Sequence, residues 1–236
     1  MFYYYDPTYL LLIPGLLLAL YAQFKVTSAF NHWKQVPSRI GMTGAQIARA
    51  ILDSNGCRDV AVERVSGSLT DHYDPKANVI RLSSSVYDSC STAAIGVACH
   101  EAGHAVQYAE NYFPIRIRSA IIPVTNFGSK LAMPLILAGI LFSFFGYVSD
   151  MLIYLGIGCF ALSTVFQLVT LPVEFNASRR AMEAIDHANL LNEEERKGAR
   201  KTLSAAAMTY VAAAAVSFAQ LLRLILLFGN RGRRRD

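Results

Sequence analysis

The sequence predicts a mainly α-helical integral membrane protein that carries one small α+β module. Three observations lead to this fold class. Charged residues make up only 17% of the 236 residues, whereas soluble domains average about a quarter. Several long stretches contain no charged residue at all. The polar residues gather instead in one segment whose patterns are typical of both helices and strands.

The first uncharged stretch, residues 7–24, is rich in leucine and is long enough to span a membrane as a helix. Tyrosines flank it at both ends, where aromatic side chains favour the membrane interface. We therefore assign residues 1–24 to an N-terminal transmembrane helix. The alternative is a helix buried in a soluble core.

A transmembrane hairpin is predicted over residues 131–173. Its two uncharged halves, residues 131–148 and 151–173, are separated only by Ser149 and Asp150. So short a connection leaves no room for a domain between the two helices.

The rest of the C-terminal part divides into two segments. Residues 174–201 are strongly charged and helical in pattern, and residues 202–236 form an alanine-rich helix followed by a basic tail. The alanine-rich helix could span the membrane, lie at its interface or pack on the other helices. The total is therefore three to four transmembrane helices.

Basic residues near the helix ends predict a multi-pass protein of the cell membrane with residues 25–130 and 174–201 in the cytoplasm. They follow the first span and flank the hairpin on both sides, while the hairpin tip has none. They are Lys25, Lys34, Arg39, Lys130, Arg179 and Arg180. The tail RGRRRD contradicts this orientation if the last helix spans. Such a tail suits anionic lipid headgroups, and no pattern indicates binding to nucleic acid.

Residues 25–130 are predicted to contain the α+β module. Thr43 is an N-cap candidate for a helix that stops at Asn55-Gly56. Residues 60–65 and 77–83 alternate like strands, and DHYDP between them reads as a polar loop. A second helix, STAAIGVACHEAGHAVQYAEN, follows with Ser91 as its N-cap candidate.

The HEAGH sequence of that second helix predicts a zinc site. His100 and His104 lie four residues apart, so both imidazoles project from one face of the helix. Zinc binds such nitrogens at about 2.0–2.1 Å and prefers four tetrahedral ligands. Glu101 projects at an angle to the pair, where it can act as general base on a water molecule that the metal activates. Two histidines at this spacing are otherwise often plain polar surface.

A hydrolytic zinc site needs a third protein ligand. The HExxHxxGxxH pattern, which supplies a third histidine, is absent, because positions 107 and 110 are Gln and Glu. No apolar segment carries an aspartate suited to this role. Glu174, the first charged residue after the hairpin, is the best candidate. The alternative is an ordinary glutamate at a helix start, favoured by the helix dipole.

HEAGHAVQ joined to LPVEFNASRRA across a hydrophobic hairpin resembles the YugP-type membrane zinc metallopeptidases. DHYDPKANVIRLS and AAAMTYVAAA extend the likeness over most of the chain. More distantly, HEAGH followed by EFNASRRA resembles the HtpX and CAAX prenyl protease group. That resemblance implies a zincin-like catalytic module of the gluzincin type with Glu174 as third ligand. The aspartate that orients a ligand histidine in that group falls on Ser178, a departure, and Asn176 could share its role.

The resemblance also implies an edge strand beside the zinc helix that pairs with an extended substrate. Our candidates for this strand are Asn78, Val79, Ile80, Arg81 and Leu82; an ordinary sheet strand is the alternative. His72 and Tyr73 fit a turn better than a cleft. Tyr210 or His187 could stabilise the oxyanion, although each could equally be structural.

The hypothesis from the sequence is a membrane endopeptidase with one Zn²⁺ per chain, acting on peptide or protein substrates near the bilayer. A rival of another class is a membrane scaffold or chaperone-like subunit whose metal site is vestigial or regulatory. A third hypothesis is an intramembrane protease with the HEAGH helix in the bilayer, which the polar flanks YDSCST and YAEN disfavour.

Overall fold

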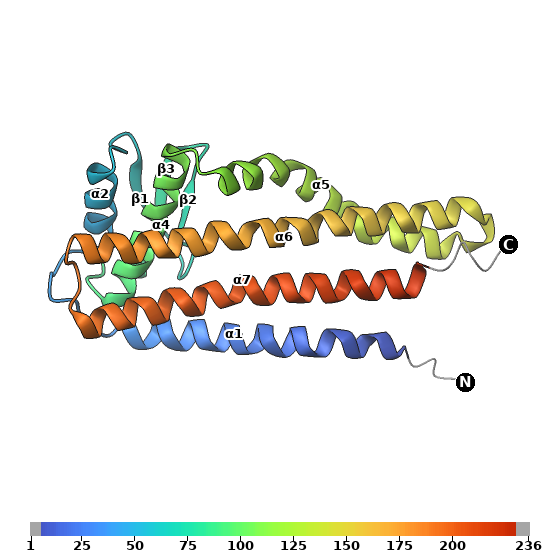
Figure 1. Ribbon diagram of the computed structural model, residues 1–236, viewed down its shortest axis with the longest axis horizontal. Coiled ribbons are helices and arrows are strands. Elements are labelled where there is room, and N and C mark those ends of the chain that lie inside the picture. Colours follow the sequence, from blue (N-terminus) through green and yellow to red (C-terminus); the bar gives the residue numbers. More distant parts are fainter. Residues whose placement is uncertain (1–5, 230–236) are drawn as a thin grey trace. The chain divides into compact units, whose positions relative to one another are not determined.

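The structure is a computed structural model that describes residues 6–229 (Figure 1). It contains helices and one small sheet, so the mainly α-helical class is confirmed, whereas the zincin-like topology stays a prediction. The elements, in chain order, are η1 (Pro7–Leu11), α1 (Leu12–Trp33), α2 (Gly44–Ser54), β1 (Ala61–Val65), β2 (His72–Asp74), β3 (Val79–Ser83), α3 (Ser84–Tyr87), α4 (Thr92–Ala109), α5 (Phe113–Leu141), η2 (Ser143–Phe145), α6 (Tyr147–His187) and α7 (Glu193–Phe228).

The described chain divides into two compact units. The first, which we call the helical unit, holds the described residues up to Tyr21, Ile117–Leu171 and the described residues from Tyr210 on. The second, the mixed unit, holds Ala22–Arg116 and Pro172–Thr209. The mixed unit contains the whole sheet and the HEAGH helix, but residues 117–130, expected in the α+β module, belong to the helical unit.

Four helices within residues 6–229 are long and apolar enough to cross a membrane. They are Pro7–Trp33, Phe113–Leu141, Tyr147–His187 and Glu193–Phe228. Many large apolar side chains on these helices are solvent-exposed, among them Phe127 at 69% and Leu17 at 61% exposure. Apolar surface on this scale is costly in water and suits lipid. The last helix, left open by the sequence, is thus a fourth candidate span.

The turn of the hairpin lies earlier than predicted. Helix α5 ends at Leu141 and α6 begins at Tyr147, so Ser149 and Asp150 belong to the first turn of α6. Gly146, at φ +58°, reverses the chain in a conformation that other residues rarely adopt. A single aspartate does not end a helix; at an N-terminus it complements the dipole. The Ser149 hydroxyl donates to the Gly139 carbonyl across the hairpin at 2.6 Å.

The segment boundaries drawn after residues 24, 130, 173 and 201 all fall inside continuous helices, namely α1, α5, α6 and α7. Hydropathy shows where the charged residues begin. A helix does not end there, because it continues as long as its backbone hydrogen bonds continue. The basic tail at residues 231–236 and the tyrosines at positions 3–5 lie outside the described residues.

An ion pair joins the start of η1 to α7 within the helical unit. Asp6 caps η1 by accepting from the Thr8 N–H, and its other oxygen lies 2.7 Å from the Arg223 guanidinium. Arg223 also lies over the Tyr9 ring, 3.8 Å from its centroid. Because both charges are largely buried, each compensates for the desolvation of the other.

The mixed unit has a core between α2, α4 and the sheet. Thr43 and Gln46 form a capping box at the start of α2, and Ser91 caps α4, so both N-cap predictions are confirmed. Helices α2 and α4 pack together, and α4 also contacts β2 and β3. Fully buried aliphatic residues fill the space between them, namely Ile47, Leu52, Ile80, Leu82 and Ile95.

The prediction that residues 78–82 form an edge strand is wrong. The sheet order is β1-β3-β2, with β1 parallel and β2 antiparallel to β3. Strand β3 is therefore central, and Asn78 precedes it in a turn at φ +54°. DHYDP, expected to be a loop, supplies β2. The Asp74 side chain accepts hydrogen bonds from the N–H groups of Lys76 and Ala77, and the resulting turn lets β3 run antiparallel to β2. Within residues 6–229, only β1 and β2 have an unpaired edge.

Candidate metal centre

Helix α4 holds both histidines of the predicted pair at the centre of the mixed unit. Most of its residues are small and buried, which lets neighbouring elements approach closely. His100 and His104 lie one turn apart, with ring centroids 4.8 Å apart and planes nearly perpendicular at 86°. The two imidazoles thus project from one face of the helix, as their spacing predicts.

Gly103 lets helix α6 pass close to this pair. A Cβ atom at position 103 would lie 3.0 Å from the Ala177 carbonyl oxygen, tighter than ordinary contact. Ala177 is one helical turn beyond Glu174 on α6. The small residue inside HEAGH therefore has a structural purpose, which is to bring the helix that carries Glu174 against the helix that carries the histidines.

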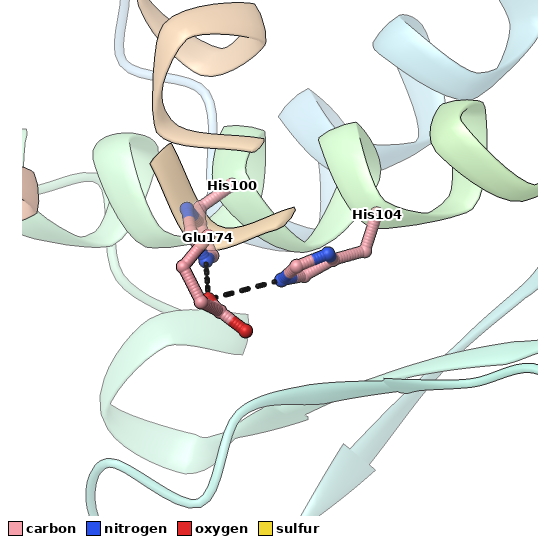
Figure 2. A group of neighbouring side chains, drawn as sticks. All are labelled: His100, His104 and Glu174. Carbon is pink, nitrogen blue, oxygen red and sulfur yellow. Dashed lines mark hydrogen bonds and ion pairs between the residues drawn. The ribbon is translucent and has the colours of Figure 1, made fainter. Parts of the chain in front are cut away.

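Glu174 reaches the histidine pair, as Figure 2 shows. Its Oε2 atom lies 3.3 Å from His100 Nε2 and 3.4 Å from His104 Nε2. One potential ligand atom from each of the three residues lies within 4.8 Å of the others. The structure thus brings together the three residues that the sequence and the resemblance proposed as metal ligands.

This donor set fits zinc. A tetrahedral site with ligands about 2.0–2.1 Å from zinc places neighbouring ligand atoms about 3.3–3.4 Å apart. The distances from Glu174 Oε2 to the two imidazole Nε2 atoms both match that edge length. Glu174 is only 2% exposed, and a buried carboxylate facing two imidazole nitrogens requires a cation, either a proton or a metal, between them. Two histidines and one carboxylate are a common zinc ligand set.

Glu101 lies beside this cluster, 7% exposed, and is not one of its three members. Burial raises the pKa of the Glu101 carboxyl group to about 7. The charge of His100 opposes this rise, whereas the Glu174 carboxylate adds to it. A carboxyl group whose pKa lies near neutrality can both accept and release a proton, which general acid–base catalysis requires.

Each histidine has a polar partner at its other ring nitrogen. Ser178 Oγ lies 3.2 Å from His100 Nδ1, so the hydroxyl occupies the place expected from the resemblance. His104 Nδ1 lies 3.0 Å from Gln107 Oε1. Asn176 contacts neither histidine in the described contacts; it accepts from Gln107 at 2.9 Å and from Arg180 at 2.8 Å. Its influence on the site therefore passes through Gln107.

Two further candidates lie elsewhere. His187 is in the last turn of α6, roughly 20 Å along the helix from Glu174 at 1.5 Å per residue, so it cannot stabilise an oxyanion at the cluster. It lines a separate cavity of about 510 Å³ between α2, α4 and α6. Tyr210 lies in α7 within the helical unit, and its role stays a prediction.

Sequence reasoning missed Gln107 as a site residue. In the sequence, position 107 stands out only as a place where a third histidine is lacking. The signal was present, however: Gln107 follows His104 by three residues, and side chains three apart on a helix share a face.

Comparisons with known proteins identify the family of this chain. Residues 8–229 match the family described as "Putative neutral zinc metallopeptidase". The chain is 50% identical over 220 residues to "Putative membrane protease YugP" of Bacillus subtilis (strain 168), covering 93% of this chain and 96% of that protein. No solved structure matches the chain significantly. Because both matches extend over nearly the whole chain, the protein belongs to this neutral zinc metallopeptidase family.

Proposed function

We propose that the protein is a membrane-embedded zinc endopeptidase that holds one Zn²⁺ with His100, His104 and Glu174. The observation that carries the proposal is the position of Glu174 Oε2 at 3.3 and 3.4 Å from the two imidazole nitrogens. Its support is the nearby buried carboxyl group of Glu101 and the membership of a zinc metallopeptidase family.

In the proposed reaction, Glu101 moves the proton. Bound zinc would supply Lewis acidity, which polarises the peptide carbonyl and makes water more acidic. Glu101 accepts a proton from the attacking water as the water oxygen bonds to the carbonyl carbon. It then delivers this proton to the amide nitrogen as the C–N bond breaks, giving a carboxylic acid and an amine. Ser178 and Gln107 hold the two imidazoles in orientation.

Metal analysis and cleavage of a blocked peptide test the proposal together. The purified full-length protein in detergent is expected to carry one zinc per chain and to cut an internally quenched peptide whose termini are acetylated and amidated. A chelator should abolish cleavage, and added Zn²⁺ should restore it. Internal cleavage identifies an endopeptidase, because an exopeptidase needs a free terminus. Protein without stoichiometric zinc or cleavage would support the scaffold hypothesis instead.

We propose further that the mixed unit faces the cytoplasm and that substrates are peptides or proteins near the bilayer. If all four candidate helices span, η1 and the end of α7 at Phe228 lie on the same side, and the Asp6–Arg223 ion pair supports this by joining η1 to α7. The segments between α1 and α5 and between α6 and α7 then lie on the other side. The basic residues there, such as Lys34 and Arg39, favour the cytoplasm, whereas the tail RGRRRD, which follows a spanning α7, favours the opposite orientation.

Single-cysteine labelling in intact cells tests this orientation. In a cysteine-free background, Arg58→Cys in the mixed unit should be protected from a membrane-impermeant maleimide, because it faces the cytoplasm. Ser143→Cys at the exposed hairpin turn should react, and both sites should react after the cells are opened. Reaction of Arg58→Cys, but not of Ser143→Cys, in intact cells would reverse the orientation.

A further inference from the structure

Gln107 joins the two helices that supply the candidate metal ligands. Its side chain is fully buried on α4. Its Nε2 atom donates to the Val173 carbonyl at 2.9 Å and to Asn176 Oδ1 at 2.9 Å, both on α6. Val173 immediately precedes Glu174. A single amide therefore contacts His104 on one helix and the backbone next to the carboxylate ligand on the other.

The partners of this amide determine which of its ends is the donor. A backbone carbonyl can only accept, so the atom next to Val173 must be the NH₂ group. Asn176 Oδ1 also receives the Arg180 Nε–H, which can only donate, so the atom of Asn176 that faces Gln107 is an oxygen. Both ends of the chain of hydrogen bonds require the same assignment, and Gln107 Oε1 is consequently the atom that faces His104.

An amide oxygen can only accept, so His104 must carry a proton on Nδ1. A neutral imidazole with this proton has its lone pair on Nε2, the atom that faces Glu174. We infer that Gln107 is a positioning residue that fixes the tautomer and ring orientation of His104, so that Nε2 is ready to bind the metal. The inference rests on the proposed zinc site and extends it.

His100 has no equivalent constraint. Its Nδ1 atom faces the Ser178 hydroxyl at 3.2 Å, and a hydroxyl can either donate or accept. Ser178 therefore permits both tautomers, whereas Gln107 permits one. The chain of hydrogen bonds from Gln107 continues through Arg180, whose NH2 atom donates to the exposed Glu110 at 2.6 Å. His104 is thus the more firmly oriented of the two histidines.

The zinc affinities of two variants at position 107 test the positioning role of Gln107. Gln107→Met keeps the size but offers only a weakly accepting sulfur in place of the amide oxygen, and it should weaken Zn²⁺ binding about 10–100-fold, the usual effect of losing such a partner. Gln107→Glu can still accept from His104 Nδ1–H and should bind Zn²⁺ within a few-fold of the unchanged protein. Affinities are measured by competition with a chromophoric chelator, and Gln23→Met, an exposed site in the same unit, serves as the matched control.

The comparison separates positioning from general packing. If Gln107 only tied α4 to α6 through its NH₂ group, Gln107→Glu would be as impaired as Gln107→Met, and the inference would be overturned. Unchanged affinity in Gln107→Met would also overturn it. Thermal unfolding of the metal-free variants shows whether each folds.

Nitrogen-15 NMR of the histidine-labelled protein with Gln107 in place reports the tautomer of His104 directly. It should show His104 protonated at Nδ1 and zinc-bound through Nε2, with the signals assigned by loss in His104→Asn. Binding through Nδ1 would refute the inference while leaving the proposed function intact. A protein that binds no Zn²⁺ before any substitution would refute the proposed function itself.

Discussion

Replacing Glu101 by glutamine should leave zinc bound and reduce peptide hydrolysis by about 10²–10⁴-fold, the usual contribution of a positioned general base. Glutamine has nearly the same shape but cannot take a proton from water. Since Glu101 is not one of the three clustered ligand residues, the metal content should not change. Turnover of the blocked peptide and zinc content, measured on one preparation, give both quantities.

Glu183→Gln is the matched control for this experiment. Glu183 is an exposed glutamate whose partner is Arg179, one turn away on the same helix, and surface pairs of this kind contribute about 0–1 kcal/mol to stability. The control should therefore keep full activity. Glu101→Gln protein that cleaves at the unchanged rate would show that another group accepts the proton.

Replacing Glu174 by glutamine should lower zinc affinity at least about 100-fold, beyond the 10–100-fold typical of losing an outer partner, and should abolish cleavage. Glutamine removes the negative charge at the atom that faces both imidazoles, and an amide is a poor ligand for zinc. Competition with a chelator measures the affinity, and peptide turnover at saturating Zn²⁺ measures the activity.

The Glu174 experiment is informative because it can fail clearly. If Glu174→Gln binds one zinc with unchanged affinity, a different side chain completes the metal site and the proposed ligand set is wrong. Glu183→Gln again provides the control, since it lies on the same helix and changes the charge by the same amount.

Local patterns account for what the sequence predicted well. The histidine pair depends only on helix geometry, because residues four apart share a face wherever the helix lies. The caps at Thr43 and Ser91 depend on a few neighbouring residues, and the apolar spans depend on composition. Glu174 could be proposed as third ligand because few charged residues lie near the hairpin, but its approach to His100 depends on packing at Gly103.

The predictions that failed depended on tertiary structure. Strand β2 is three residues long and polar at His72 and Asp74, so nothing in its composition distinguishes it from a loop; only pairing with β3 makes it a strand. This pairing also makes β3 central. The direction of the Gln107 amide, likewise, follows from the carbonyl of Val173, 66 residues away, which no local pattern could reveal.

The separation of the ligands along the chain has a consequence for biosynthesis. His100 and Glu174 lie 74 residues apart, and all of α5 and the part of α6 that precedes Glu174 come between them. A nascent chain that has not yet completed the hairpin has two imidazoles and no carboxylate to join them. If the proposed ligand set holds, the complete zinc site forms only after α5 and α6 as far as Glu174 have been synthesised, so a shorter chain would lack the carboxylate ligand.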